Sequence, residues 1–260
     1  MKTKYLKYAP PLLVALLASN SAIATPSYFY SGSGIASQWA ETSPGSGVLS
    51  TTAGLTATID SIMAGNASAP GGAVQLVTAT GSTPSLTGSV ETLTADFGGG
   101  NVLTLSSLNA ADWGTAGSGG LLDIWAQAYS TAYAPSLSVN DIENLLPTLS
   151  AFELSQSNPF ISYANLAYGE ISIGLAGYYP TVPTFPTNTQ FSKIVKATFH
   201  GVTEYLFSMG PATASGVHEN TNTAALTGNY EVKIPEPSAL ALLFAGLTGF
   251  LGLRRKAVTA

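Results

Sequence analysis

The stretch Val90-Glu-Thr-Leu-Thr-Ala-Asp-Phe-Gly-Gly-Gly-Asn-Val-Leu-Thr-Leu-Ser-Ser-Leu108 decides the fold. Apolar and polar residues alternate on both sides of its Gly-Gly-Gly-Asn segment, so Leu93 and Leu105 would each lie on an apolar face. Alternation with a period of two is typical of a strand that is buried on one face, and Gly and Asn favour turns. The stretch therefore predicts an antiparallel hairpin with one face toward a core.

The same alternation recurs further along the chain. It predicts two more hairpins and a last strand, at Phe160–Leu166 with Glu170–Ala176, Phe191–His200 with Val202–Met209, and Asn229–Ile234. Helix is predicted mainly in one block, at about residues 109–156. Together these patterns predict a mostly β (α+β) fold, an antiparallel β-sandwich-like domain with a helical insertion.

Two helices are expected inside this block. The first spans Leu121 to Tyr133, with an apolar stripe at Leu121, Trp125, Ala128 and Ala132. Asn140 is placed to cap the next helix, with Glu143 three residues later as its capping-box partner. Pro147 should end or kink that helix, because proline lacks the backbone donor that a helix interior needs.

Charged residues are scarce and unevenly placed. The 260 residues hold no Cys, 9 Lys and Arg, and 14 Asp and Glu, for a net charge of −5. This excludes a strongly basic nucleic-acid-binding protein and any Cys-ligated metal site. The sequence has no Lys or Arg from Tyr8 to Ser192. Six basic residues lie at the two ends, next to apolar runs, which is a targeting pattern.

The N-terminal end has the three parts of a secretory signal peptide. Met1–Tyr8 is basic, and Ala9–Ala18 is apolar but too short to span a bilayer. Ala22 and Ala24 then form the small-x-small pattern that signal peptidase accepts. We therefore expect residues 1–24 to be a signal peptide, cleaved after Ala24. A buried N-terminal helix is the alternative, which the order of the three parts disfavours.

The C-terminal end also places three features in order. Pro235-Glu236-Pro237 is followed by an apolar run at residues 238–253 and then by Arg254, Arg255 and Lys256. The run predicts a short single transmembrane helix at 238–253, because local thinning and snorkelling make up for its length. The basic tail 254–256 acts as a cytoplasmic stop, so the chain before it would lie across the membrane, as the signal peptide requires.

These three C-terminal features resemble the PEP-CTERM sorting signal of bacterial exported proteins. Such a signal implies processing by an exosortase, a membrane-embedded cysteine peptidase or transpeptidase of bacteria that make exopolysaccharide. Ile234 stands where Val is usual in this signal. A plain single-pass anchor and a glycolipid-anchor signal, whose tail is also removed, are the alternatives.

The chain therefore divides into a signal peptide at 1–24, a mature β-rich extracellular domain at 25–233 and a sorting signal at 234–260. Within the mature domain, Ser157–Tyr163 and Glu170–Gly177 look similar to uncharacterised PEP-CTERM proteins, notably cyanobacterial ones. That resemblance implies no activity.

The sequence predicts no catalytic, metal-binding or cofactor-binding residue. His200 and His218 lack the spacing of a zinc site and are expected in a turn and a loop. Trp113 and Trp125 are expected in the core rather than on a sugar-stacking platform. A glycosidase needs two facing carboxylates, for which spacing alone offers Glu153 with Glu170 or Glu91 with Asp96.

Three functions stay open, and none of them involves nucleic acid. We expect an exported protein without enzymatic activity that is first a membrane-anchored precursor and then lies at the cell surface or outside the cell. Its role would be structural or adhesive, in a matrix of exopolysaccharide or a biofilm. The alternatives are a polysaccharide-binding module and an extracellular hydrolase. Signal peptidase, exosortase, the membrane and exopolysaccharide are the expected partners.

Overall fold

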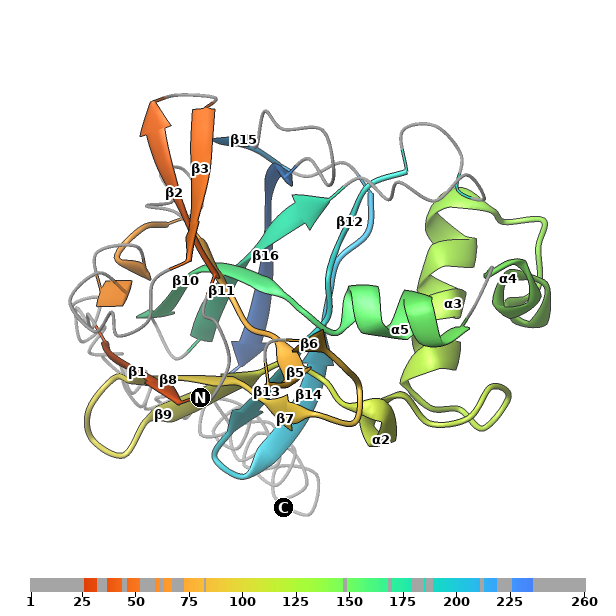
Figure 1. Ribbon diagram of the computed structural model, residues 1–260, viewed down its shortest axis with the longest axis horizontal. Coiled ribbons are helices and arrows are strands. Elements are labelled where there is room, and N and C mark those ends of the chain that lie inside the picture. The colour runs from red at the N-terminus through yellow and green to blue at the C-terminus, as the bar shows by residue number, and fades with distance from the viewer. Residues whose placement is uncertain are drawn as a thin grey trace, which may run out of the picture.

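The structure is a computed structural model of residues 1–260. It describes residues 26–31, 37–43, 46–51, 59–60, 63–66, 73–81, 83–146, 149–167, 170–178, 185, 189–210, 213–218 and 226–235. In this part of the chain, antiparallel strands outnumber helices and form two large sheets (Figure 1). The predicted mostly β fold with antiparallel sheets is confirmed.

The first sheet has five strands and contains the hairpin predicted at residues 90–108. Its order is β1 (Ser27–Ser31), β8 (Thr92–Asp96), β9 (Val102–Ser106), β13 (Val195–Phe199) and β14 (Val202–Leu206). Strands β8 and β9 form the predicted antiparallel hairpin, and they pair from Thr92 with Ser106 to Asp96 with Val102. Leu93 and Leu105 are fully buried, whereas Thr94 and Thr104 are only half-buried on the other face. The predicted alternation is therefore correct.

The second predicted hairpin joins β13 to β14 through a two-residue turn. His200 has φ +49° and Gly201 has φ +78°, the positive values that a tight turn matched to strand twist requires. Val195, Ala197 and Phe199 are buried as expected. The predicted strand from residue 191 is nevertheless divided, because β12 (Phe191–Ser192) pairs with β11 in the other sheet.

The second sheet has eight strands. Its order is β15 (Thr213–His218), β16 (Leu226–Pro235), β11 (Glu170–Tyr178), β10 (Phe160–Ala167), β4 (Ala73–Gln75), β2 (Ser37–Ser43) and β3 (Ser46–Thr51), with β12 also paired to β11. The hairpin β10–β11 and the last strand were both predicted. His218 was expected in a loop, but it is the last residue of β15 and pairs with Thr227.

A third, small sheet lies along the chain between β4 of the eight-stranded sheet and β8 of the five-stranded sheet. It consists of β6 (Thr83–Pro84), β5 (Thr78–Thr80) and β7 (Ser89–Val90). Val90 therefore belongs to β7, and the predicted strand that began at Val90 starts only at Thr92. Thr78 links this sheet to its surroundings, since its hydroxyl lies 2.7 Å from both Ser107 Oγ and the Leu108 carbonyl oxygen.

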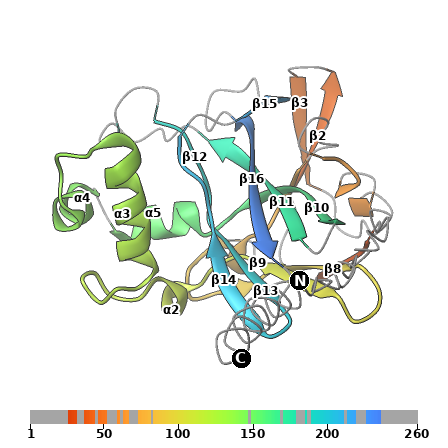
Figure 2. The same cartoon turned by 180° about the vertical axis from the view of Figure 1, so that it is seen from behind.

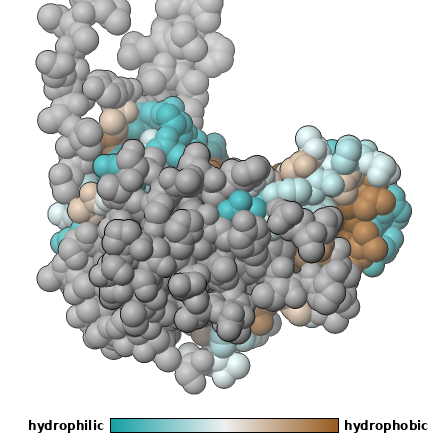
Figure 3. Space-filling model, turned by 90° about the horizontal axis from the view of Figure 1, so that it is seen from above, coloured by the Kyte–Doolittle hydropathy of each residue, from teal (hydrophilic) through white to brown (hydrophobic). Residues whose placement is uncertain are grey.

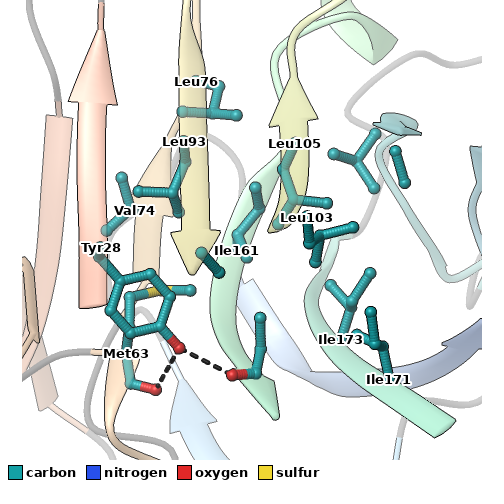
Figure 4. Packing of buried hydrophobic residues seen from close by; sticks show 14 of the residues in the cluster. Tyr28, Met63, Val74, Leu76, Leu93, Leu103, Leu105, Ile161, Ile171 and Ile173 are labelled. Atoms are coloured by element: carbon teal, nitrogen blue, oxygen red, sulfur yellow. Dashed lines mark hydrogen bonds between the residues drawn. The ribbon is translucent and has the colours of Figure 1, made fainter. Parts of the chain in front are cut away.

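The main core lies between the two large sheets. It is built from aliphatic side chains of both, among them Leu93, Leu105, Ile161 and Ile173, which are fully buried (Figure 4). Tyr28 enters this core from β1, and its hydroxyl donates to the carbonyl oxygens of Ala164 at 2.8 Å and Met63 at 3.4 Å. These hydrogen bonds satisfy the buried hydroxyl, so the ring can be buried without an unpaired polar group.

The helices form a separate block at one end of the sheets (Figures 1 and 2). They are α2 (Ala110–Trp113), α3 (Leu121–Tyr133), α4 (Val139–Leu145) and α5 (Leu149–Gln156). The predicted first helix has the same bounds as α3. Its buried face differs from the predicted stripe, because Ala132 is exposed and Ala128 half-buried, whereas Tyr129 and Ala126 are buried. Tyr129 stacks on Trp125, so the buried face of α3 includes both rings.

The cap of α4 also differs from the prediction. Ser138, not Asn140, is the N-cap: it accepts from the Asp141 N–H, and the Asp141 carboxylate accepts from the Ser138 N–H at 3.0 Å. Glu143 is buried instead of capping the helix. Helix α4 ends at Leu145, two residues before Pro147, as the proline argument requires.

Apolar side chains remain on the surface of the helical block. Ile124 is 54% exposed and Leu145 is 50% exposed. Figure 3 shows apolar surface gathered at this end of the molecule. A pocket of about 100 Å³ lies here, lined by Tyr129, Ala134, Leu137, Ile142, Leu145, Leu146 and Phe185.

Candidate processing site at the end of the last strand

The predicted sorting residues fall at the boundary of the described chain. Pro235 is the last residue of β16 and the first of the Pro-Glu-Pro motif. Outside the described residues lie Ala22, Ala24, Glu236, Pro237, Arg254, Arg255 and Lys256, and with them the predicted signal peptide and transmembrane helix. Among the helices that the structure describes, none combines the length and apolar character of a membrane span.

The end of β16 is paired to β11 residue by residue. The register runs from Tyr230 with Leu175 to Ile234 with Ile171 and Pro235 with Glu170. Strand β15 lies on the other side of β16, where it pairs with Asn229 and Thr227. The motif therefore begins inside a sheet, and its first residue is part of the folded domain.

One face of β16 is held by the main core. Tyr230 is 5% exposed and Ile234 is 7% exposed, and Val232 between them packs against the cluster. The Tyr230 hydroxyl also donates to the Gly210 carbonyl oxygen. Residues 230, 232 and 234 alternate as a half-buried strand requires, so the side chain directly before Pro235 is anchored in the core.

The opposite face of β16 carries an ion pair next to the motif. Lys233 Nζ lies 2.7 Å from Glu170 Oε1 and 3.6 Å from Glu231 Oε1. The hydrogen bond and charge of Glu170 raise the pKa of Lys233. Glu170 is also the ladder partner of Pro235, so this exposed pair joins the start of β11 to the end of β16.

The side chain of Tyr163 on β10 extends across β11 to β16, where it contacts Glu231. The ring of Tyr163 on β10 lies against Gly174 on β11, so closely that a Cβ at Gly174 would be 2.2 Å from Tyr163 Cε1. Its hydroxyl donates to Glu231 Oε2 on β16 at 3.2 Å. Burial, followed by the Glu231 charge, raises the pKa of Tyr163, which keeps the hydroxyl a donor. Gly174 thus allows one side chain to connect three strands.

The other residues singled out from the sequence have structural contacts. Glu91 is buried and Oε2 accepts from the Val77 N–H at 2.8 Å, while Asp96 Oδ1 accepts from the Gly98 N–H at 2.8 Å. His200 is exposed, with Nε2 3.1 Å from Asn101 Oδ1. Within the described ranges, no three acidic or histidine side chains gather as metal ligands would.

Trp113 and Trp125 are both fully buried, so their predicted place in the core is confirmed. Trp113 Nε1 donates to Ser157 Oγ at 3.0 Å. The third tryptophan, Trp39, lies on β2, and its side chain falls outside the described part of the structure.

Sequence reasoning missed a partly buried polar cluster that joins the helices to the five-stranded sheet. Asp112 Oδ1 on α2 accepts from Lys196 Nζ at 2.6 Å and from the Tyr205 hydroxyl at 2.9 Å. Burial alone would raise the pKa of Asp112, but these donors and the Asn109 N–H lower it. Burial and the Asp112 carboxylate raise the pKa of Tyr205 to about 12. The available signal was Lys196, which lies with Lys193 on the predicted strand Phe191–His200.

A second missed feature is a carboxyl pair between α3 and α4. Asp123 accepts backbone hydrogen bonds from Gly117, at 2.7 Å, and from Gly119. Glu143 shares a hydrogen bond with Asp123, which lowers the pKa of Asp123. Burial first, and then Asp123, raise the pKa of Glu143 to about 7. The pair connects the glycine-rich loop before α3, through Asp123, to Glu143 in the second half of α4.

Comparison with known proteins identifies the C-terminal end. Residues 233–256 match the family described as the PEP-CTERM protein-sorting motif. The chain is therefore a PEP-CTERM domain-containing protein, and the motif indicates an exported protein that is processed by an exosortase. No curated protein and no solved structure matches the chain.

Proposed function

We propose that this chain is an exported surface or extracellular-matrix protein with a structural or adhesive role, linked to exopolysaccharide and biofilm. The observation that carries the proposal is the sorting motif at residues 233–256, which follows a folded antiparallel β domain without an intervening linker. A domain built this way can be delivered intact once the tail is removed.

The proposal implies an order of events. Signal peptidase removes residues 1–24, and residues 238–253 hold the precursor in the membrane with Arg254–Lys256 on the cytoplasmic side. The exosortase then separates the domain from this segment. Because β16 ends at Pro235, removal of the tail beyond the motif leaves the sheet and the core complete.

The direct test is to express the full chain in a bacterium with and without its exosortase and to measure the intact mass of the product. The proposal expects loss of the hydrophobic tail only where the exosortase is present. A Glu236→Gln variant should be processed less, whereas Glu204→Gln, an exposed change on β14, should behave like the unchanged chain. A tail retained equally in both strains would refute the proposal.

A polysaccharide-binding module is the second candidate, and one observation favours it. On the outer face of the five-stranded sheet, the ladder aligns Phe29, Thr94, Thr104, Thr198 and Thr203 in a single row. Paired residues of an antiparallel ladder share a face, and strands lie about 4.8 Å apart, so the row is roughly 19 Å long. Leu93 and Leu105 project to the opposite, core face.

The chemistry of this row suits a neutral sugar chain. Phe29 is 55% exposed and offers an aromatic ring, while threonines offer hydroxyl groups beside small apolar methyls. Lys196, in the next row, has its charge neutralised by Asp112, and the Asp96 carboxylate lies in the row on the other side. A face with hydroxyls, an exposed ring and a carboxylate matches a polyhydroxylated, uncharged ligand better than an acidic one.

Retention on immobilised exopolysaccharide of the native host tests this second function. Phe29→Ala should weaken retention by about two- to tenfold, since an aromatic stacking contact is worth about 0.5–1.5 kcal/mol. Val202→Ala is the matched control, because Val202 is 54% exposed but is the ladder partner of the buried Phe199. Equal retention of both variants and the parent chain would exclude this face as the binding site.

A further inference from the structure

We infer that the folded domain itself sets the upstream limit of processing: the exosortase breaks a bond on the C-terminal side of Pro235, and the Pro235–Glu170 ladder pair gates its access. This inference rests on the proposed function and adds to it where the chain is cut and what controls the rate.

The chemistry of the step is that of a cysteine peptidase. One peptide C–N bond breaks, the carbonyl carbon passes to the peptidase thiolate, and the new amine leaves with a proton. Water or an acceptor nucleophile then releases the acyl group from the sulfur. For this attack the residues beside the bond must be held in the cleft of the enzyme in a fixed geometry.

The strand before Pro235 is not free to enter such a cleft. Residues 230–235 pair with β11, and Ile234 and Tyr230 are buried in the core. Withdrawing Ile234 would expose an aliphatic side chain and leave backbone groups of β11 without partners. This part of β16 therefore stays in the sheet while the domain is folded.

Pro235 is the first residue that can leave the sheet at low cost. It is the last residue of its strand, where ladders fray, and as a proline it has no N–H to donate. Its partner Glu170 is held next to it by the ion pair with Lys233, 2.7 Å long and exposed to solvent. Opening of this last pair gives the enzyme the Pro-Glu-Pro motif without unfolding the core. Glu170 and Lys233 are thus positioning residues for processing.

The experiment follows processing of the full chain in cells that hold the exosortase, with intact mass and the fraction of precursor as readouts. The mature chain should retain Ile234 and end at Pro235 or later. A double variant, Glu170→Gln with Lys233→Gln, should end at the same residue but be processed about two- to fivefold faster, because an exposed ion pair is weak. Glu204→Gln should be processed at the parent rate, and melting temperatures show that all variants fold.

A spacer separates gating from a general effect on stability. Six Gly and Ser residues inserted between Ile234 and Pro235 place the motif outside the ladder. In this background the Glu170 and Lys233 substitutions should no longer change the rate, as a double-mutant cycle requires for a local gate. An effect of the same size with and without the spacer would overturn the gate.

Different outcomes would overturn the gate at Pro235 and the proposed processing by the exosortase. A mature chain that ends at Ile234 or earlier overturns this inference and leaves exosortase processing intact. A precursor that keeps its tail even with the exosortase present overturns the proposed function, and the inference with it.

Discussion

The two hydrophobic clusters of this protein are built from different side chains. The cluster between the large sheets is mainly aliphatic, and Leu93, Leu105 and Ile173 in it are fully buried. The cluster of the helical block is centred on Trp125, whose ring lies 4.6 Å from Phe152 and 5.3 Å from Tyr129. Aromatic pairs favour stacked or edge-to-face arrangements, and both occur around Trp125, which stacks on Tyr129 and meets Phe152 edge to face.

Buried polar atoms are satisfied to a similar extent in the two regions. In the described structure, Tyr30 Oη and Glu91 Oε1 near the five-stranded sheet lack a hydrogen-bond partner, and so do Trp125 Nε1 and Glu143 Oε1 in the helical block. The block also holds the apolar pocket and exposes Leu145. Among the described residues, the sheet cluster holds more buried side chains than the helical cluster, so we expect it to supply more of the stability. Strand β16 belongs to it through Ile234.

The largest expected effect comes from a cavity in the sheet core. Ile173→Ala should lower the free energy of unfolding by about 2–5 kcal/mol, because Ile173 is fully buried beside Val232 of β16. Leu145→Ala, at the half-exposed rim of the pocket, should cost less than about 1 kcal/mol. Urea unfolding of both variants measures the difference, and equal losses would contradict the comparison.

The next effect concerns the polar cluster that joins the two regions. Asp112→Asn should cost about 1.5–3 kcal/mol at pH 7, since it removes the charge that pairs with Lys196 and accepts from Tyr205. The pKa of Asp112 is lowered in the folded protein, so its contribution is present above the unfolded value of about 3.9 and is lost as pH falls below it.

Unfolding in urea at pH 7 and at pH 3 checks this dependence. The gap between the parent chain and Asp112→Asn should be wide at pH 7 and narrower at pH 3, because the contribution declines as pH falls from about 3.9 toward the lowered pKa of the folded protein. Asp96→Asn, at an exposed hairpin turn, is the control and should show a small gap at both values. A gap that does not change with pH would mean that charge is not what holds this cluster.

A smaller loss is expected from the crossing of Tyr163 over β11. Gly174→Ala should cost about 1–3 kcal/mol, because the new Cβ would lie 2.2 Å from the Tyr163 ring and the ring must move. Tyr163→Phe, which keeps the ring and removes the hydrogen bond to Glu231, should cost about 1 kcal/mol. Thermal unfolding of the two variants tests this order, and a neutral Gly174→Ala would contradict the close contact.

The smallest effect is a gain, and it comes from the helical block. The pKa of Glu143 is raised to about 7, so folding favours its protonated form and stability is lost as pH rises through 7. Glu143→Gln keeps the neutral shape and should raise the melting temperature by about 2 °C at pH 8 but not at pH 5. If Glu143→Gln melts at a lower temperature than the parent chain at pH 8, the ionised Glu143 carboxylate does not destabilise the folded protein.

Local patterns predicted three hairpins, the last strand and α3, but not the short strands β1 to β7, nor how the elements meet. The alternation of Leu93 and Leu105 is a property of neighbouring residues, and it correctly placed β8 and β9. The cap of α4 was misassigned because Ser138 with Asp141 and Asn140 with Glu143 fit the same spacing. In the structure Ser138 is the N-cap, and Glu143 is buried with a hydrogen bond to Asp123 on α3. That tertiary contact cannot be predicted from spacing within the helix.

The candidate site shows the same division. Its motif could be predicted because Pro-Glu-Pro, the apolar run and the basic tail are consecutive in the sequence, and the family match at residues 233–256 agrees with that prediction. The contacts around the motif could not be predicted. Lys233 meets Glu170 and Tyr163 meets Glu231 only through the ladder of β10, β11 and β16, and no spacing in the sequence reports such a register.

The measurement that tests the central claim most directly is the intact mass of the protein from the envelope and medium of its native host. Peptides should be made with a Glu- or Asp-directed protease, because trypsin has no site from Tyr8 to Ser192. The account predicts a chain without residues 1–24 and without the tail, ending at Pro235 or shortly after it. A chain that continues to Ala260 would contradict it and would make the protein a single-pass membrane protein.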